Sequence, residues 1–360
     1  MRKLWTLLAC AALGCGGTQS RIEFGAAGPW TQGYGAMNRR GIELAVEEIN
    51  ASPTLAGRPL SVRFRDDEGD GGKATAVAGE FVGDPAVVAV VGHVNSGAMV
   101  AAAKVYDGHL AAVSTTATSP DLTGISPWVF RVISSDSANG LDLARFARRL
   151  GRRRAAVLYE NNSYGRGLTE SFRRGFGGEI VSIDPIVADS ADFEPFVTYF
   201  KRQRADLVFV AGTERSGIAI LREARRQGLD ADFLGGDGWT GLVNDPAAAE
   251  GAYVGAPFSA SDPRPAARRF VSTFRRKFGR VPDGNAALAY DATWLLAQAV
   301  ADAGSDREGV RDYLASLRSH GGFAGATGSI RFGPNGDPVD RGIVMTRVHR
   351  GALLVQGSGR

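Results

Sequence analysis

One stretch of the sequence, residues 87–122, constrains the fold more than any other. It begins with an unbroken apolar run, Val87–Val91, which is typical of a strand buried on both faces of a sheet. A helix is expected to follow and to continue to about Tyr106. A second apolar run, Leu110–Val113, then opens directly into the hydroxyl-rich segment 114–119. Two successive strands are therefore expected to end in small polar residues.

The ends of these two strands form a candidate ligand site. In an open parallel sheet, ligands bind beyond the carboxyl ends of the strands, where backbone N–H groups and helix N-termini face a crevice. Ser96 follows the first strand and segment 114–119 follows the second. Their hydroxyl and N–H groups can hold a carboxylate without a buried counter-charge. The alternative is that Ser96 or Asn95 only caps a helix and that the hydroxyl run only forms a turn.

Strands and helices alternate along most of the remaining chain. Further strands are expected at Arg21–Ala26, Leu60–Arg65, Ala155–Tyr159, Glu179–Ile183, Leu207–Ala211, Phe233–Gly235, Gly342–His349 and Ala352–Gln356. Further helices are expected at Ala36–Asn50, Ala74–Val82, Gly165–Phe176, Phe193–Arg202, Ser216–Gly228, Pro265–Phe278 and Asn285–Ala303, with another beginning within Ser134–Asn139. This alternation implies right-handed crossovers and parallel, doubly wound sheets, an α/β fold.

The chain is expected to divide into two lobes joined by a three-crossing hinge, since 360 residues are many for a single core. The crossings are expected at Trp128–Ile133, Val254–Phe258 and Ile330–Phe332. The predicted first lobe contains residues 21–133 and 258–331, and the predicted second lobe contains residues 134–257 and 332–360. Three crossings can bend while keeping both lobes in register, which suits the enclosure of a small solute.

Residues 1–20 have the pattern of a lipoprotein signal peptide and linker. Two basic residues precede an apolar segment, Leu4–Leu13, that is too short to span a bilayer. Residues 12–15 form a plausible lipobox, so cleavage before Cys15 would make Cys15 the lipidated first residue of a protein of the bacterial periplasm. Two alternatives remain open: a lipobox that ends at Cys10, and an ordinary secretory signal with two incidental cysteines.

The composition argues against a nucleic-acid partner and against catalysis. The formal net charge is +4, and discounting the two basic residues of the signal segment leaves +2, which is too weak to indicate nucleic-acid binding. Both cysteines lie in the signal segment, so no thiol, disulfide or cysteine metal site is expected in the mature protein. The histidines are scattered without metal spacing, at His93, His109, His320 and His349. No enzyme, cofactor or metal is therefore predicted.

Two remaining features have simple interpretations. Segment 66–71 is similar to the first half of a calcium-binding loop, but Val77 stands where such a loop needs its bidentate glutamate. The segment is therefore expected to be a solvated turn that caps the next helix. His93 follows the first strand of the candidate site, where it can contact a ligand or close a turn.

Five segments, in this order and spacing, resemble the leucine/isoleucine/valine-binding family of bacterial solute-binding proteins. They are GHVNSG, STTATSPDLTG, WVFRVISSDSANG, AVLYENNSYGRGL and GGDGW. The resemblance covers about residues 22–355. It implies the type I periplasmic binding fold and a role beside the permease subunits of an ABC importer.

The resemblance also implies a set of ligand-binding residues. The ligand α-carboxylate would be bound at Ser96 together with Thr116, Ala117 and Thr118. The α-ammonium would be bound by Asp237, whose alternative role is an Asx turn. Two aromatic residues match ligand-contacting tyrosines and would otherwise be surface or core residues, namely Tyr164 and Tyr34. A weaker candidate pair, facing the cleft from a helix, is Tyr290 and Asp291.

One departure from the family pattern bears on the ligand. Thr213 or Glu214 stands where the family places a tyrosine, just after strand Leu207–Ala211. An unpaired carboxylate at Glu214 would disfavour an apolar side-chain subsite, because burying it costs several kcal/mol. The expected function is capture of an amino acid or similar small zwitterion for an ABC importer. The sequence leaves the ligand open among a branched-chain amino acid, which Glu214 disfavours, a polar or cationic amino acid, and a related amide. The alternatives are a ligand-sensing receptor for a membrane partner and a lipoprotein scaffold that binds nothing.

Overall fold

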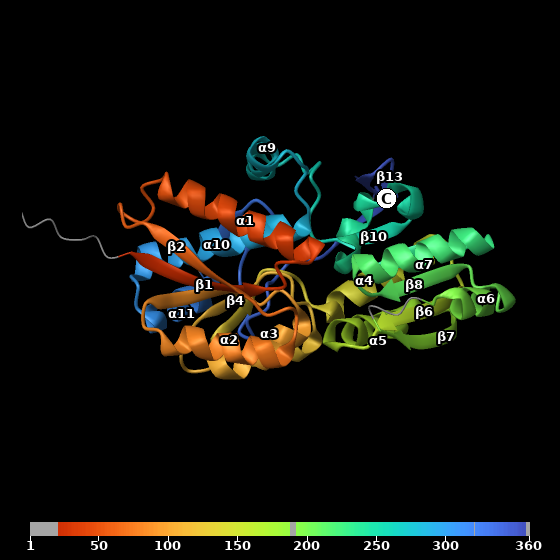
Figure 1. Ribbon diagram of the computed structural model, residues 1–360, viewed down its shortest axis with the longest axis horizontal. Helices are drawn as coiled ribbons and strands as arrows, with labels where there is room; N and C mark the ends of the chain where they lie inside the picture. Colours follow the sequence, from red (N-terminus) through yellow and green to blue (C-terminus); the bar gives the residue numbers. More distant parts are fainter. Residues whose placement is uncertain (1–20, 188–191, 320, 358–360) are drawn as a thin grey trace, which may run out of the picture.

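The computed structural model describes residues 21–187, 192–319 and 321–357. The predicted signal segment, with Cys10 and Cys15, lies outside these residues, so the lipidation of Cys15 stays a prediction. Within them the chain forms two α/β lobes side by side (Figure 1), as the sequence predicted. No helix in the described part of the chain is long and apolar enough to cross a membrane.

The first lobe is built on a parallel sheet of five strands in the order β2-β1-β3-β4-β5. Its strands are β1 (Ile22–Gly28), β2 (Leu60–Asp66), β3 (Val87–Gly92), β4 (Ala112–Ser114) and β5 (Val129–Arg131). The expected burial of β3 on both faces is confirmed. Val88 and Val91 join the hydrophobic cluster on one face, whereas Val87 and Val90 join the cluster on the other.

Helices cover both faces of this first sheet (Figure 1). The helices on one face are α1 (Gly33–Asn50), α10 (Gly284–Ala303) and α11 (Arg307–Ser316). The helices on the other face are α2 (Gly71–Gly83) and α3 (Ser96–Tyr106). Outside them, α9 (Pro265–Phe278) packs its apolar side on α1 and α10 through Phe270 and Phe274.

The second lobe contains a mixed sheet of seven strands in the order β14-β13-β10-β9-β8-β6-β7. The parallel strands are β6 (Arg154–Glu160), β7 (Glu179–Ile186), β8 (Leu207–Ala211), β9 (Asp232–Gly235) and β10 (Tyr253–Ala256). Two antiparallel strands complete one edge, β13 (Val344–His349) and β14 (Ala352–Val355).

The second sheet is also covered on both faces. One face carries α4 (Asp136–Arg149) and α5 (Ser163–Phe176). The other carries α6 (Glu194–Arg202), α7 (Glu214–Gln227), α8 (Pro246–Ala249) and a 3₁₀ segment, Asp237–Asn244. Helices on both faces of each sheet are the doubly wound arrangement that strand–helix alternation predicted.

The chain passes between the two lobes three times. It leaves the first sheet after β5, leaves the second after β10, and returns to the second after a hairpin of β11 (Phe323–Gly325) and β12 (Gly328–Ile330). That hairpin and α11 were not among the elements expected from the sequence. Val310 and Leu314, four residues apart on α11, are nevertheless buried in the first-lobe core, which is the spacing of an amphipathic helix.

Candidate functional site

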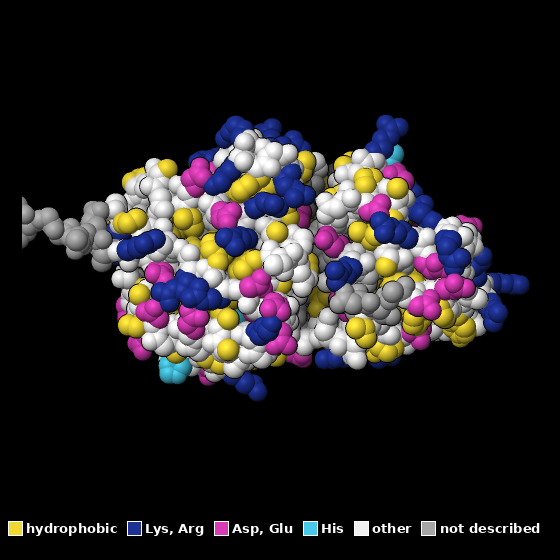
Figure 2. Space-filling model, in the orientation of Figure 1, with side chains coloured by type: hydrophobic (Ala, Val, Ile, Leu, Met, Phe, Trp, Pro, Cys, Tyr) yellow, Lys and Arg dark blue, Asp and Glu magenta, His cyan; other side chains and the backbone are white. Residues whose placement is uncertain are grey.

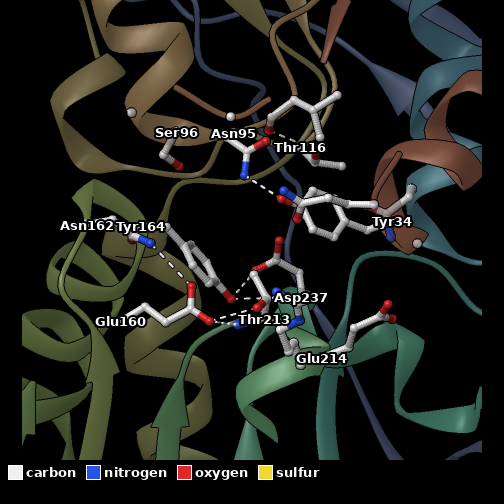
Figure 3. Close-up of a pocket in the computed structure, with 18 of the residues that line it drawn as sticks. Tyr34, Asn95, Ser96, Thr116, Glu160, Asn162, Tyr164, Thr213, Glu214 and Asp237 are labelled. Atoms are coloured by element: carbon white, nitrogen blue, oxygen red, sulfur yellow. Dashed lines mark hydrogen bonds between the residues drawn. The ribbon is translucent and has the colours of Figure 1, made fainter. Parts of the chain in front are cut away.

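A cleft with a cavity of about 650 Å³ lies between the lobes, and both lobes line it. Figure 2 shows the groove that separates the two lobes on one face of the molecule. Residues from the first lobe that line the cavity include Gln32, Gly33, Tyr34, Val94, Asn95, Ser96 and Thr116. Residues from the second include Glu160, Asn162, Tyr164, Thr213, Glu214 and Asp237 (Figure 3). Six of the sequence-predicted residues are therefore brought to one cavity.

Ser96 is the first residue of α3, directly after the strand β3 and its connecting loop. Its Oγ accepts hydrogen bonds from the backbone N–H groups of Thr118 and Ser119, each at 3.1 Å. A serine hydroxyl has two acceptor positions and one donor. Both acceptor positions are therefore used within the protein, and the O–H proton is left for donation to a ligand.

In the hydroxyl-rich segment after β4, Thr116 faces the cavity, whereas Ala117 and Thr118 do not. Thr116 lines the cavity, and its Oγ1 donates a 3.1 Å hydrogen bond to the carbonyl of Val94. Ala117 and Thr118 are fully buried and are not among the lining residues. The Oγ1 of Thr118 donates a 2.8 Å hydrogen bond to the buried carboxylate of Asp136. In this structure, Ala117 and Thr118 thus support the wall behind Ser96.

Tyr34 and Asn95 form a polar pair on the first-lobe side of the cleft. Nδ2 of Asn95 donates a 2.8 Å hydrogen bond to the phenol oxygen of Tyr34 (Figure 3). Burial raises the pKa of Tyr34 to about 12, so the phenol stays a neutral donor at physiological pH. Oδ1 of Asn95 is buried without a hydrogen-bond partner among the described residues. The pair therefore offers a ligand one donor and one acceptor.

Tyr164 and Asp237 form the corresponding pair on the second-lobe side. The phenol of Tyr164 donates a 3.1 Å hydrogen bond to Oδ1 of Asp237 and accepts one from the backbone N–H of Gly238 at 3.1 Å. Burial raises the pKa of Asp237 to about 6. Burial, and next the charge of Asp237, raise the pKa of Asp136 well above its usual value. A cation beside Asp237 would relieve this unfavourable accumulation of negative charge.

Glu160 is a lining residue that the sequence interpretation did not include. It ends strand β6, and its Oε1 accepts hydrogen bonds from Thr213 N (2.8 Å), Thr213 Oγ1 (2.7 Å) and Ser216 Oγ (2.9 Å). Asn162 caps α5 through a 2.9 Å hydrogen bond from the backbone N–H of Gly165. Both residues lie at or just beyond the carboxyl end of strand β6. The rule that selected Ser96, that ligands bind beyond the carboxyl ends of strands, would have found them too.

Glu214 is the first residue of α7, and its side chain lines the cleft. No hydrogen bond or ion pair joins its carboxylate to another side chain in the described part of the chain. Burial, and next the negative charge of Asp283, raise its pKa above the usual value. The structure thus places the Glu214 carboxylate at the cavity, near which it was expected from the sequence.

Other predicted polar residues lie outside the lining. The phenol of Tyr290 donates a 2.5 Å hydrogen bond to Glu48, and Asp291 accepts hydrogen bonds from the backbone N–H groups of Ala326 (2.7 Å) and Thr327 (2.8 Å). Both residues stabilise the packing of α10 and do not face the cavity.

His93 and part of the acidic segment 66–71 also have structural roles. Asp70 caps α2, as expected for a turn before a helix. Asp67 is fully buried, however, so the prediction of a solvated turn is wrong at this residue. Its Oδ2 lies 2.6 Å from Nδ1 of His93, whose Nε2 lies 2.9 Å from the phenol oxygen of Tyr106. The contact with His93 compensates part of the free energy that burial of the Asp67 carboxylate costs.

Comparison with known proteins places this chain among binding proteins. A family model described as periplasmic binding protein matches residues 26–352. The leucine-, isoleucine-, valine-, threonine- and alanine-binding protein of Pseudomonas aeruginosa is 29% identical over 351 residues, which cover 93% of this chain and 92% of that protein.

Two solved structures have the same fold over nearly the whole chain. The branched-chain amino acid transporter substrate-binding protein of Streptococcus pneumoniae, in complex with isoleucine, superposes with a TM-score of 0.86 at 28% identity and covers 93% of this chain and 99% of that chain. An ABC transporter substrate-binding protein of Desulfitobacterium hafniense, in complex with leucine, has a TM-score of 0.80 at 32% identity and covers 93% and 100%.

The relatives and solved structures named above are substrate-binding proteins, not enzymes. The two-lobed doubly wound fold, the cleft lined by both lobes and the match over residues 26–352 agree with one another. The chain belongs to the periplasmic binding protein family.

Proposed function

We propose that this protein is the solute-binding component of an ABC importer and that it captures an amino acid or a similar small zwitterion in the cleft. One observation carries the proposal: a single cavity contains a hydroxyl donor at Ser96 and, from the other lobe, the carboxylate of Asp237 held by Tyr164. These are complementary to a carboxylate and an ammonium, respectively. Isoleucine and leucine, which are bound in the two related solved structures, carry both groups.

Each half of the ligand has a defined partner in this proposal. The α-carboxylate accepts a hydrogen bond from the Ser96 hydroxyl, with Thr116 beside it. The α-ammonium donates a hydrogen bond to Asp237. This ion pair compensates part of the hydration that both charged groups lose on binding. Tyr34 and Tyr164 flank the ligand with rings and phenol groups. Because the partners come from both lobes, binding favours a closed arrangement of the lobes.

In this proposal the three crossings act as the hinge of a lobe movement. We assign residues 21–133 and 258–331 to one lobe and residues 134–257 and 332–360 to the other, with the crossings as the hinge. A ligand that contacts both lobes stabilises the closed state by its differential affinity for that state. Cys15 would tether the mature protein to the membrane by lipid, so that the closed form can meet the permease subunits at the periplasmic face.

A thermal-shift screen of the purified protein tests the binding function. Common amino acids, small amides and short-chain carboxylates are added one at a time. A ligand at about one hundred times its dissociation constant stabilises by roughly 2.7 kcal/mol, which raises the midpoint by several degrees. We expect a shift with one class of amino acid and none with carboxylates that lack an amino group. No shift with any of these compounds would contradict the proposal and favour a scaffold.

Transport and sensing are separated by a second experiment. Loss of this protein from the bacterium should abolish uptake of the radiolabelled ligand found in the screen, and the wild-type chain should restore it. A Cys15→Ser chain, which cannot be lipidated at that residue, should restore uptake less well. Uptake that is unchanged without the protein would favour a ligand-sensing receptor.

A further inference from the structure

The cavity offers little aliphatic surface to a branched apolar side chain. Among its described lining residues, the larger apolar groups are Val94 and the rings of Tyr34 and Tyr164, and no leucine, isoleucine, phenylalanine or tryptophan is present. An apolar side chain gains about 25 cal/mol for each Å² that it transfers from water to an apolar surface, so this gain needs apolar walls. The described lining instead contains four carboxylates and one basic residue, the exposed Arg215.

The four carboxylates differ in how well the protein already satisfies them. Glu68 forms a 2.5 Å ion pair with Lys73. Glu160 accepts three hydrogen bonds at one oxygen atom. Asp237 accepts a hydrogen bond from Tyr164 and is assigned above to the α-ammonium. Glu214 is the one of these four carboxylates without a hydrogen bond or ion pair to another described side chain.

Space for the Glu214 carboxylate comes from two glycines, one in each lobe. A side chain at Gly241, in the 3₁₀ segment of the second lobe, would overlap Oε2 of Glu214. A side chain at Gly33, the first residue of α1 in the first lobe, would collide with Oε1. The carboxylate therefore reaches across the cleft between two small residues, neither of which offers it a counter-charge.

The environment of Glu214 is unfavourable for an ionised carboxylate and would favour a bound cation. Burial raises the pKa of this group, the carboxylate of Asp283 raises it further, and the charge of Arg280 offsets only part of this rise. A cation in direct contact with Glu214 would supply the ion pair that no described side chain forms, because partly buried carboxylates are stabilised by charged donors. In Figure 3, Asp237 lies between Ser96 and Glu214. A ligand bound at Ser96 and Asp237 can thus extend its side chain toward Glu214.

We infer that the ligand is an amino acid with a cationic side chain, an ammonium or a guanidinium, which forms an ion pair with Glu214. This inference rests on the proposed function, since it uses Ser96 and Asp237 to orient the α-carbon. It assigns the carboxylates of Asp237 and Glu214, neither of which forms an ion pair with a described side chain, to two different cationic groups of one ligand. The cavity of about 650 Å³ has room for the long side chain of lysine or arginine.

Two other roles for Glu214 are outcomes of the test. A glutamate at the first position of α7 favours the helix through its macrodipole. The carboxylate also lies beside the start of α1, whose N-cap residue Gln32 forms no side-chain capping hydrogen bond. In that position Glu214 would link the lobes whatever the ligand is. If Glu214 acts only on the helix or between the lobes, loss of its carboxylate would change the affinity for all ligands equally. If it forms an ion pair with the ligand, the loss would weaken the binding of cationic ligands most.

The experiment is isothermal titration of the purified protein with lysine, arginine and ornithine, and with leucine, isoleucine and glutamine. We expect the wild-type protein to bind at least one basic amino acid at least tenfold more tightly than leucine. In Glu214→Gln, the ratio of basic to neutral affinity should fall at least tenfold. The matched control is Glu223→Gln, on the same helix but outside the cavity lining, which should leave the ratio within twofold of wild type.

Each contrary result has a separate meaning. Wild-type protein that binds leucine or glutamine but no basic amino acid would overturn this inference and leave the proposed function standing. Equal weakening of all ligands in Glu214→Gln would also overturn it, in favour of a link between the lobes. Wild-type protein that binds neither these amino acids nor any compound of the thermal-shift screen would overturn the proposed function together with the inference. The selectivity of the wild-type protein decides the matter even if the variant folds poorly.

Discussion

The guanidinium of Arg131 binds the carboxylate of Asp337, 206 residues later in the chain, with 2.7 Å between Nε and Oδ1. Arg131 ends β5, and only 2% of its side chain is exposed. Asp337 lies on the segment that returns from β12 to the second sheet. The same guanidinium donates 2.8 Å hydrogen bonds to the carbonyl of Ser119 and the hydroxyl of Thr123. One buried cation thus joins two of the chain's crossings to the wall behind the ligand site.

Asp337→Ala should lower the free energy of unfolding by about 3–5 kcal/mol, because it leaves the buried guanidinium of Arg131 without a counter-charge. Urea denaturation followed by circular dichroism measures the change. Glu170→Ala is the control, since it removes an exposed ion pair with Arg173 and should cost less than about 1 kcal/mol. Equal and small losses in the two variants would show that water replaces the Asp337 carboxylate.

Ser96→Ala should weaken both the fold and ligand binding. The substitution deprives the buried N–H groups of Thr118 and Ser119 of their acceptor, and unsatisfied groups of this kind cost about 1–3 kcal/mol. It also removes the hydroxyl donor to the ligand carboxylate, for a similar loss of binding free energy. Chemical denaturation and titration calorimetry measure the two effects. A stable variant with normal affinity would remove Ser96 from the site.

Asp237→Asn should abolish binding of the ammonium-bearing ligand and raise the thermal midpoint of the free protein at pH 7.5. The neutral amide still accepts a hydrogen bond from Tyr164 but carries no buried charge, which is costly for the free protein. Scanning calorimetry with and without ligand tests both effects. A variant that is less stable than wild type, or that binds normally, would contradict this account of Asp237.

Ligand affinity should fall as the pH is lowered through 6. Burial raises the pKa of Asp237 in the free protein to about 6, and only the ionised carboxylate pairs with the ammonium. One pH unit below this pKa, about one protein molecule in ten has the ionised form, so affinity at pH 5 should be roughly tenfold weaker than at pH 7.5. Titration calorimetry across this range provides the measurement, and a flat profile would contradict it.

The stability of the free protein should respond in the opposite direction. An aspartate carboxyl ordinarily has a pKa of 3.8, whereas the pKa of Asp237 in the fold is about 6, so the folded state binds more protons than the unfolded state between these values. The contribution of this group to stability is therefore present below about pH 4 and is lost as the pH rises through 6. The difference in unfolding free energy between wild type and Asp237→Asn, measured from pH 4 to 7.5, isolates this contribution.

Sequence alone predicted two doubly wound lobes, because a parallel strand that is buried on both faces requires a continuous apolar run and the helices between such runs show a period of about 3.6 residues. Val87–Val91 is the clearest case, since its side chains enter both hydrophobic clusters of the first lobe. The same local logic located Ser96 and the hydroxyl segment that contains Thr116, which follow the ends of strands, whereas Asp237 was predicted from the family resemblance. The same strand-end rule would have predicted Glu160, at the end of β6, but it was not applied there. The sequence did not predict α11 or the β11–β12 hairpin.

Only the tertiary structure decided which polar groups remain available to a ligand. Asp67 was expected in water but is paired with His93, 26 residues away, and Thr118 was expected at the ligand but turns to Asp136. The antiparallel direction of β13 and β14 is likewise set by where the third crossing enters the second sheet. A strand or helix is specified by the period of neighbouring residues, whereas these pairings depend on segments that come together only when the lobes are packed.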